Sequence, residues 1–245
     1  MEITKHTQNI LVKSYQCDRY GYLRPIMLMN FLQGAAATHA EVLGAGRTYC
    51  EEHNIAWVVT HNMVDIIELP KFKDRVVLKT WPSYHNGLRS YRDYEIRSAD
   101  DNRLMIRATS QWVLINLNTR RLLRLNDELP DWGSINERTW ERDFDKAPKF
   151  DAEKTHIIKC RFDDVDVNQH INNAVYAVWA TESVGFEFRN THTLSGIEIY
   201  FEHEIPAITP EVQIHVKLEP DTSYHRIMTG DTQHATVVCH WRTND

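Results

Sequence analysis

The residue types best suited to catalysis gather in one short stretch, DVDVNQHINNAVY at residues 164–176. Asp166, Asn168 and His170 stand two residues apart within it. In an extended segment this spacing directs all three side chains to the same side. A carboxylate, an amide and an imidazole on one side could activate water, donate to a carbonyl oxygen and transfer protons.

A buried helix is expected directly after these residues. Asn172 and Asn173 are typical helix-start residues, because their side-chain oxygens can accept from backbone N–H groups that lack a partner in the helix. The following run, 174–180, is apolar on nearly every face, and Gly185 is a suitable stop. The polar cluster is therefore expected at the positive end of a buried helix, where a developing oxyanion is stabilised.

The pattern D-x-N-x-H-x-N-N-x-x-Y, followed by W-x-x-E-S at Trp179, Glu182 and Ser183, resembles the acyl-acyl carrier protein thioesterases of plant plastids and bacteria. The resemblance implies an α+β double hotdog, in which two tandem units each wrap a curved antiparallel sheet around a long central helix. It implies an N-terminal hotdog at 1–130 as scaffold and acyl pocket, a linker at 131–150 and a catalytic hotdog at 151–245. It also implies hydrolysis of the thioester of fatty acyl-acyl carrier protein.

The family has one more catalytic carboxylate, on the strand after the helix, and the resemblance assigns it to Glu204. Glu202 and Glu198 are competing candidates in the same segment. Plant members carry a cysteine directly after this carboxylate, whereas this chain has Ile205. Direct attack by water is therefore favoured over a cysteine nucleophile.

The expected mechanism uses Glu204 to deprotonate water. Asn168 and backbone N–H groups near Asn172 and Asn173 would stabilise the oxyanion, which makes the two asparagines substrate-binding residues. His170, oriented by Asp166, would move a proton to the leaving thiolate. Spacing does not decide whether Glu204 or Asp166 is the base.

The chain order repeats, which predicts two copies of one unit. Asp18 precedes Asp164 by 146 residues, and similar offsets join Pro70 to Pro206 and Trp112 to Trp241. This register places three residues without a carboxylate or imidazole opposite Asp166, Asn168 and His170, namely Tyr20, Tyr22 and Arg24. One site per chain, in the second copy, is therefore expected.

The hydrophobic pattern predicts the elements of the first copy. They are a strand at 7–15, a turn at 17–22, a helix at 26–40 opened by Pro25, a short helix at 48–52, and strands at 55–67, 76–81, 90–98 and 104–117. Residues 129–150 have the composition of a linker, and its three large aromatics suggest that it packs on the surface.

An apolar wall for a long acyl chain is expected in the first copy, because burying each methylene contributes about 0.8 kcal/mol. The proposed substrate-binding residues are Met27, Leu28, Phe31, Leu32, Trp57 and Val59. An acidic carrier protein would also need a basic patch. The candidates are Arg120, Arg121 and Arg124, or Lys71, Lys73 and Arg75.

Composition excludes some other classes of protein. A net charge of −6 argues against nonspecific nucleic-acid binding, and no apolar run approaches the ~20 residues of a membrane-spanning helix. The four cysteines are scattered, and the N-terminus lacks a signal-peptide core, so a reducing cytoplasm is expected. No cofactor is expected, and a homodimer remains open.

Simpler interpretations exist for each residue. Asp166 alone would more often cap a turn, and a lone Asn168 or His170 would more often be a satisfied polar residue. A metal site is disfavoured because a third ligand at suitable spacing is missing. The remaining histidines are expected at the surface.

Functional alternatives are a hotdog acyl-CoA thioesterase or dehydratase, and a non-catalytic acyl-binding module.

Overall fold

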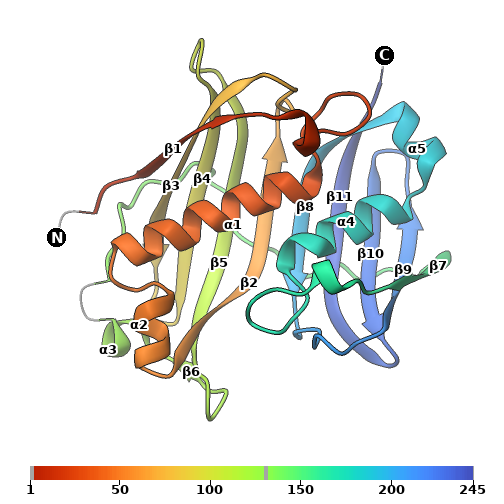
Figure 1. Cartoon of the computed structure of the whole chain (residues 1–245). Helices are drawn as coiled ribbons and strands as arrows, with labels where there is room; N and C mark the ends of the chain where they lie inside the picture. The colour runs from red at the N-terminus through yellow and green to blue at the C-terminus, as the bar shows by residue number, and fades with distance from the viewer. Residues whose placement is uncertain (1–2, 130–131, 245) are drawn as a thin grey trace. The chain divides into compact units, whose positions relative to one another are not determined.

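A computed structural model describes residues 3–129 and 132–244. The chain divides into two compact units. The first comprises the described part of residues 1–24 and 30–143, and the second comprises residues 25–29 and the described part of 144–245. Each unit contains an antiparallel sheet and a mainly apolar helix (Figure 1), so the chain belongs to the α+β class.

The first unit has five main strands in the order β1-β3-β4-β5-β2. Their bounds are β1 His6–Leu11, β2 Ile55–Ile66, β3 Arg75–His85, β4 Arg89–Ser98 and β5 Leu104–Asn116, and the short β6, Leu122–Leu123, pairs with β5. The helices are α1 Pro25–Val42, whose residues 25–29 are grouped with the second unit, α2 Arg47–Glu52 and α3 Leu125–Glu128. α1, α2, β2, β4 and β5 match the predicted elements, with Pro25 in the first turn of α1 as expected. β3 is longer than the predicted strand at 76–81, and β6 and α3 were not predicted.

The predicted first strand, 7–15, is too long. β1 ends at Leu11, and a 3₁₀ turn, η1 Ser14–Gln16, follows. The Gln16 side chain accepts from the backbone N–H of Lys13 at 2.8 Å, which closes this turn. A side chain that bonds to its own neighbouring backbone competes with strand pairing, and alternation of residue types alone does not reveal it.

The second unit has five strands in the order β8-β11-β10-β9-β7. Their bounds are β7 Lys154–Lys159, β8 His192–Phe201, β9 Glu211–Leu218, β10 Thr222–Thr229 and β11 Thr232–Thr243. The helices are the 3₁₀ turn η2 Phe162–Asp164, α4 Asn173–Ser183 and α5 Phe186–Thr191. α4 packs on β8, β9, β10 and β11, and most of its residues are buried, as its apolar sequence predicts.

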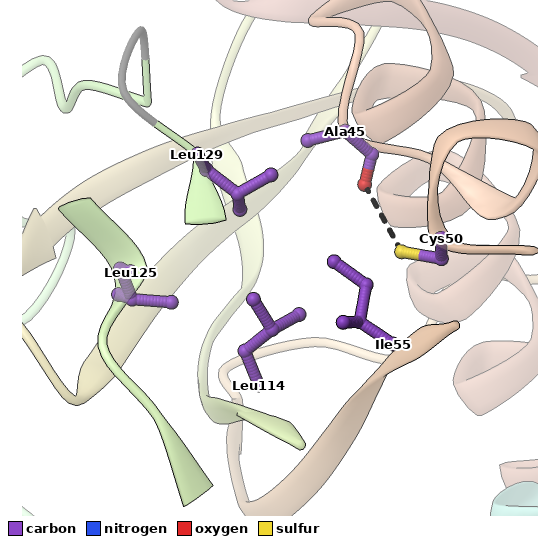
Figure 2. Packing of buried hydrophobic residues seen from close by; sticks show 6 residues of the cluster. All are labelled: Ala45, Cys50, Ile55, Leu114, Leu125 and Leu129. Carbon is purple, nitrogen blue, oxygen red and sulfur yellow. Dashed lines mark hydrogen bonds between the residues drawn. The ribbon is translucent and has the colours of Figure 1, made fainter. Parts of the chain in front are cut away.

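Each unit has its own apolar core. In the first, a cluster closes the end beyond α1, where Cys50 of α2 lies beside Ile55 and Leu114 (Figure 2). Leu125 and Leu129, which follow β6, complete this cluster. In the second, Tyr176 and Trp179 of α4 are buried, and their ring centroids lie 5.7 Å apart.

The two units contain the same turn before their helices, which fixes the register of the repeat. The N–H of Asp18 donates to the carbonyl of Tyr22 at 2.8 Å, and the N–H of Asp166 donates to the carbonyl of His170 at 2.8 Å. In both turns a carboxylate oxygen of the aspartate accepts the N–H two residues later, at 2.9 and 2.8 Å. Asp166 is therefore the counterpart of Asp18, an offset of 148 residues (166 minus 18).

This offset corrects the sequence register of 146. The first-unit counterparts of Asp166, Asn168 and His170 are Asp18, Tyr20 and Tyr22, so the first unit does carry a carboxylate at the first position. The error arose because two aspartates, at 164 and 166, flank the start of the motif. Only the hydrogen bonds of the folded turn distinguish them.

Candidate active site

The motif forms a tight turn, so the prediction of an extended segment is wrong. The N–H of Gln169 donates to the carbonyl of Asp166 at 3.0 Å, and Gln169 has a positive φ of 63°. Asp166 accepts from the backbone N–H of Asn168 at 2.8 Å, and its other oxygen lies 3.4 Å from the Asn168 side-chain amide. Short polar side chains favour such turns because they replace a backbone partner.

The turn brings His170 against Glu204. His170 Nε2 lies 3.7 Å from a carboxylate oxygen of Glu204, and both side chains are about one-third exposed, at 34% and 36%. Two backbone contacts hold the segments together. Ile171 donates to the carbonyl of Ile205 at 2.9 Å, and Ala207 donates to that of Gln169 at 3.0 Å. An imidazole and a carboxylate that were 34 residues apart (204 minus 170) therefore share one water-accessible position.

Asp166 supports His170 through the main chain. The expected contact between their side chains is replaced by the N–H of Asp166 donating to the carbonyl of His170. The carboxylate of Asp166 instead serves Asn168. The charged partner of the imidazole is Glu204.

α4 begins three residues after His170, at Asn173, and within the described part of the chain its first turn carries a backbone N–H without an acceptor. Asn172 caps the helix as predicted, because its side-chain oxygen accepts from the N–H of Ala174 at 2.8 Å. Val175 donates to the carbonyl of Asn172. Among the described groups, the N–H of Asn173 has no acceptor, as is usual in a first helical turn. Its counterpart in the first copy is Pro25, which has no N–H.

Sequence reasoning gave no role to Tyr176, which lies fully buried beneath the pair. Its ring packs edge-on against Phe201 at 5.3 Å. Burial raises the pKa of the Tyr176 hydroxyl above its usual value, the charge of Glu204 raises it further, and a hydrogen bond with the backbone of Ile205 lowers it. The counterparts in the first copy are Leu28, without a hydroxyl, and Pro70, without an N–H. Pro70 thus corresponds to Ile205, which corrects the sequence pairing of Pro70 with Pro206.

The expected acyl-wall residues lie in and beside α1 and β2. Leu28, Leu32 and Val59 are buried, and the other three are partly buried. Trp57 donates from its indole nitrogen to the carbonyl of Ala45 at 2.9 Å, and its ring lies 5.3 Å from that of Trp132. Trp57 thus packs against the cluster of Figure 2.

Three histidines expected at the surface are buried, namely His39, His225 and His234. His225 bridges Ser183 of α4 at 2.9 Å and Ser223 of β10 at 2.8 Å. Burial lowers the pKa of His225 to about 3. This serine–histidine contact is closed to solvent, so it anchors the end of α4. The hydrophobic pattern of the sequence did not predict that these histidines are buried, because histidine is a polar residue.

Two findings concern the described residues only. None of their helices is both long and apolar enough to cross a membrane. No group of three His, Cys, Asp or Glu side chains among them is arranged to hold a metal ion.

The amino-acid sequence matches models of known protein families over both of its parts. Residues 3–132 match the acyl-ACP thioesterase N-terminal domain, and residues 148–243 match the acyl-ACP thioesterase C-terminal domain. The chain belongs to the acyl-ACP thioesterase family. Glu204, His170 and the Asp166 turn all lie in the part that matches the C-terminal domain.

Relatives of this thioesterase-family chain are similar over most of its length. It is 31% identical over 217 residues to a chloroplastic palmitoyl-acyl carrier protein thioesterase from Gossypium hirsutum, covering 81% of this chain and 51% of that protein. The chain thus spans about half the length of the curated relatives it matches first.

Solved structures agree in fold. A protein from Lactobacillus plantarum described as an oleoyl thioesterase has a TM-score of 0.89 at 26% identity, covering 99% of this chain and 98% of that one. The 12:0-ACP thioesterase from Umbellularia californica has a TM-score of 0.88 at 22% identity, covering 98% of both chains, and this likeness concerns the fold alone.

Proposed function

We propose that this chain hydrolyses the thioester bond of fatty acyl-acyl carrier protein, releasing a free fatty acid and the carrier protein with its thiol. The observation that carries the proposal is the pairing of His170 with Glu204 at 3.7 Å, within a chain of the acyl-ACP thioesterase family. The cytoplasm as its location is part of the same proposal.

The fold supporting this chemistry is inferred to be a tandem double hotdog. Both units have a five-stranded antiparallel sheet, a long apolar helix and the same turn before that helix. The second unit would carry the chemistry. The first has Tyr22 in place of His170 and Leu69 in place of Glu204, so it would serve as scaffold and acyl pocket.

The base in this mechanism is Glu204. Its carboxylate removes a proton from water, and the resulting hydroxide attacks the thioester carbonyl carbon. Asp166 is a weaker candidate, because its carboxylate is engaged by Asn168. Asp18 makes the same turn bond in the unit that lacks the rest of the site.

The oxyanion is held by the amide of Asn168 and by the free N–H of Asn173 at the start of α4. A helix N-terminus favours negative charge, and preorganised donors of this kind contribute about 3–4 kcal/mol to a transition state. When the tetrahedral intermediate collapses, the C–S bond breaks. The proton taken from water then reaches the leaving thiolate through His170, which lies beside Glu204.

The test is a hydrolysis assay on acyl-acyl carrier protein and acyl-CoA in parallel. We expect Glu204→Gln to lower kcat far more than it raises KM, because the carboxylate acts on the attacking water. Glu202→Gln is the matched control, since Glu202 is exposed and bonds to Gln233 instead. Near-normal turnover by Glu204→Gln would refute the assignment of the base. Hydrolysis of neither substrate by the wild type would refute the function.

A further inference from the structure

Three large apolar side chains stand exposed around the candidate site. Phe162 is 95% exposed, Ile208 92% and Val167 72%. Phe162 and Ile208 are the most exposed large apolar residues in the described parts of the chain. Large exposed apolar side chains that gather on one surface mark places that bind a partner.

All three lie on the loops that build the site. Val167 is in the turn of Asp166, and Ile208 follows Glu204 by four residues. These two loops are joined by the hydrogen bond from Ala207 to Gln169. Phe162 begins η2, in the loop between β7 and α4 (Figure 1), and its carbonyl accepts from Val165 just before the turn.

The first unit provides an internal comparison, because its equivalent loops face solvent without these residues. The counterparts of Phe162, Val167 and Ile208 are Ser14, Arg19 and Lys73, all exposed and all polar. Folding of the loops therefore does not require bare apolar side chains at these positions.

In the first unit, cations lie over two of the three aromatic rings exposed on these loops, and the third, Tyr15, is 65% exposed. Arg19 lies over the ring of Tyr20 at 5.2 Å, and Lys73 lies over that of Phe72 at 5.3 Å. Such cations partly cover a ring and keep it compatible with water. The second unit has aliphatic side chains where the first has these cations, so its apolar surface remains open.

We propose that Phe162, Val167 and Ile208 form an apolar rim on which the acyl carrier protein docks while its acyl arm enters the site. This inference rests on the proposed function. The thioester of that substrate lies at the end of a flexible arm, so the protein that bears the arm must rest against the mouth of the site. Acyl-CoA presents the same thioester without a protein body and does not need the rim.

In this proposal the carrier protein contacts the rim mainly through apolar side chains, and attraction between charges contributes little at the rim itself. Arg161, which precedes Phe162, is already paired with Asp164 at 2.6 Å, and Asp163 on the other side of Phe162 is exposed and acidic. A basic patch elsewhere could still speed the encounter, but apolar contacts at the centre of an interface determine how tightly it holds.

The experiment compares substrates in serine variants of the rim. Phe162→Ser, Val167→Ser and Ile208→Ser should each lower kcat/KM for acyl-acyl carrier protein about threefold to tenfold, and the triple variant about a hundredfold, mainly through KM. Values for acyl-CoA should stay within about twofold of the wild type. Phe186→Ser is the matched control and should change neither, because Phe186 begins α5, beyond the C-terminal end of α4, and is 67% exposed.

Other results would overturn the rim. If the triple variant loses activity on both substrates equally or on neither, the rim does not bind the carrier. If Arg121→Glu alone is selective for carrier substrates, docking lies at the basic cluster. If the wild type floats with phosphatidylcholine–phosphatidylglycerol vesicles and the triple variant does not, the rim binds lipid. A dimer in gel filtration that becomes monomeric in the triple variant would assign it to a second copy. If the wild type hydrolyses neither substrate, the proposed function fails first.

Discussion

The repeated aspartate turn allows the structural and chemical contributions of Asp166 to be separated. Asp18 accepts backbone N–H groups from Tyr20 at 2.9 Å and Tyr22 at 3.0 Å, and Asp166 accepts that of Asn168 at 2.8 Å. Both turns lie in exposed loops, so the alanine variants Asp18→Ala and Asp166→Ala should each lose about 1 kcal/mol of unfolding free energy. For a chain of this size, this lowers Tm by about 2–4 °C.

Their effects on activity should differ widely. We expect Asp166→Ala to lower kcat on acyl-acyl carrier protein about a hundredfold, because the turn places Asn168 and His170. Asp18→Ala should remain within about twofold of the wild type, since the first unit carries neither partner. Asp166→Asn keeps an oxygen that can accept from Asn168, so it should recover much of the lost turnover.

The assays are thermal unfolding and steady-state hydrolysis on the same preparations. Equal losses of kcat in Asp18→Ala and Asp166→Ala would show that the turn acts through global stability. If Asp166→Asn is as inactive as Asp166→Ala, the charge itself is needed, and Asp166 becomes a rival of Glu204 as the base.

Three further outcomes are expected. Tyr176→Phe should lower kcat about tenfold with little change in KM, and an unchanged kcat would make the hydroxyl merely structural. Met27→Trp should shift chain-length preference toward shorter acyl groups while keeping turnover on the best substrate, and an unchanged preference would place the acyl pocket elsewhere. Because the folded pKa of His225 is about 3 against an ordinary 6.5, its contribution to stability is complete above pH 6.5 and falls as the pH drops toward 3. Denaturant unfolding should show a loss of about 2 kcal/mol from this group between pH 7 and pH 5, and the same pH dependence in His225→Asn would contradict it.

The sequence by itself determined the family, the fold class and most of the elements. Its motif identified the acyl-ACP thioesterase family, which the family models confirm. Pro25, Asn172 and Gly185 marked helix ends correctly, because capping depends on residues adjacent in the chain. The apolar run of α4 predicted a buried helix for the same local reason.

Tertiary structure decided the arrangements that depend on distant partners. The conformation of the Asp166 turn follows from hydrogen bonds that a spacing of two residues does not specify. The register of the repeat became clear only from matching turns, and His225 is buried because serines of α4 and β10 satisfy both ring nitrogens. Glu204 meets His170 through backbone bonds between loops 34 residues apart (204 minus 170), and such pairing depends on the whole sheet and helix around it.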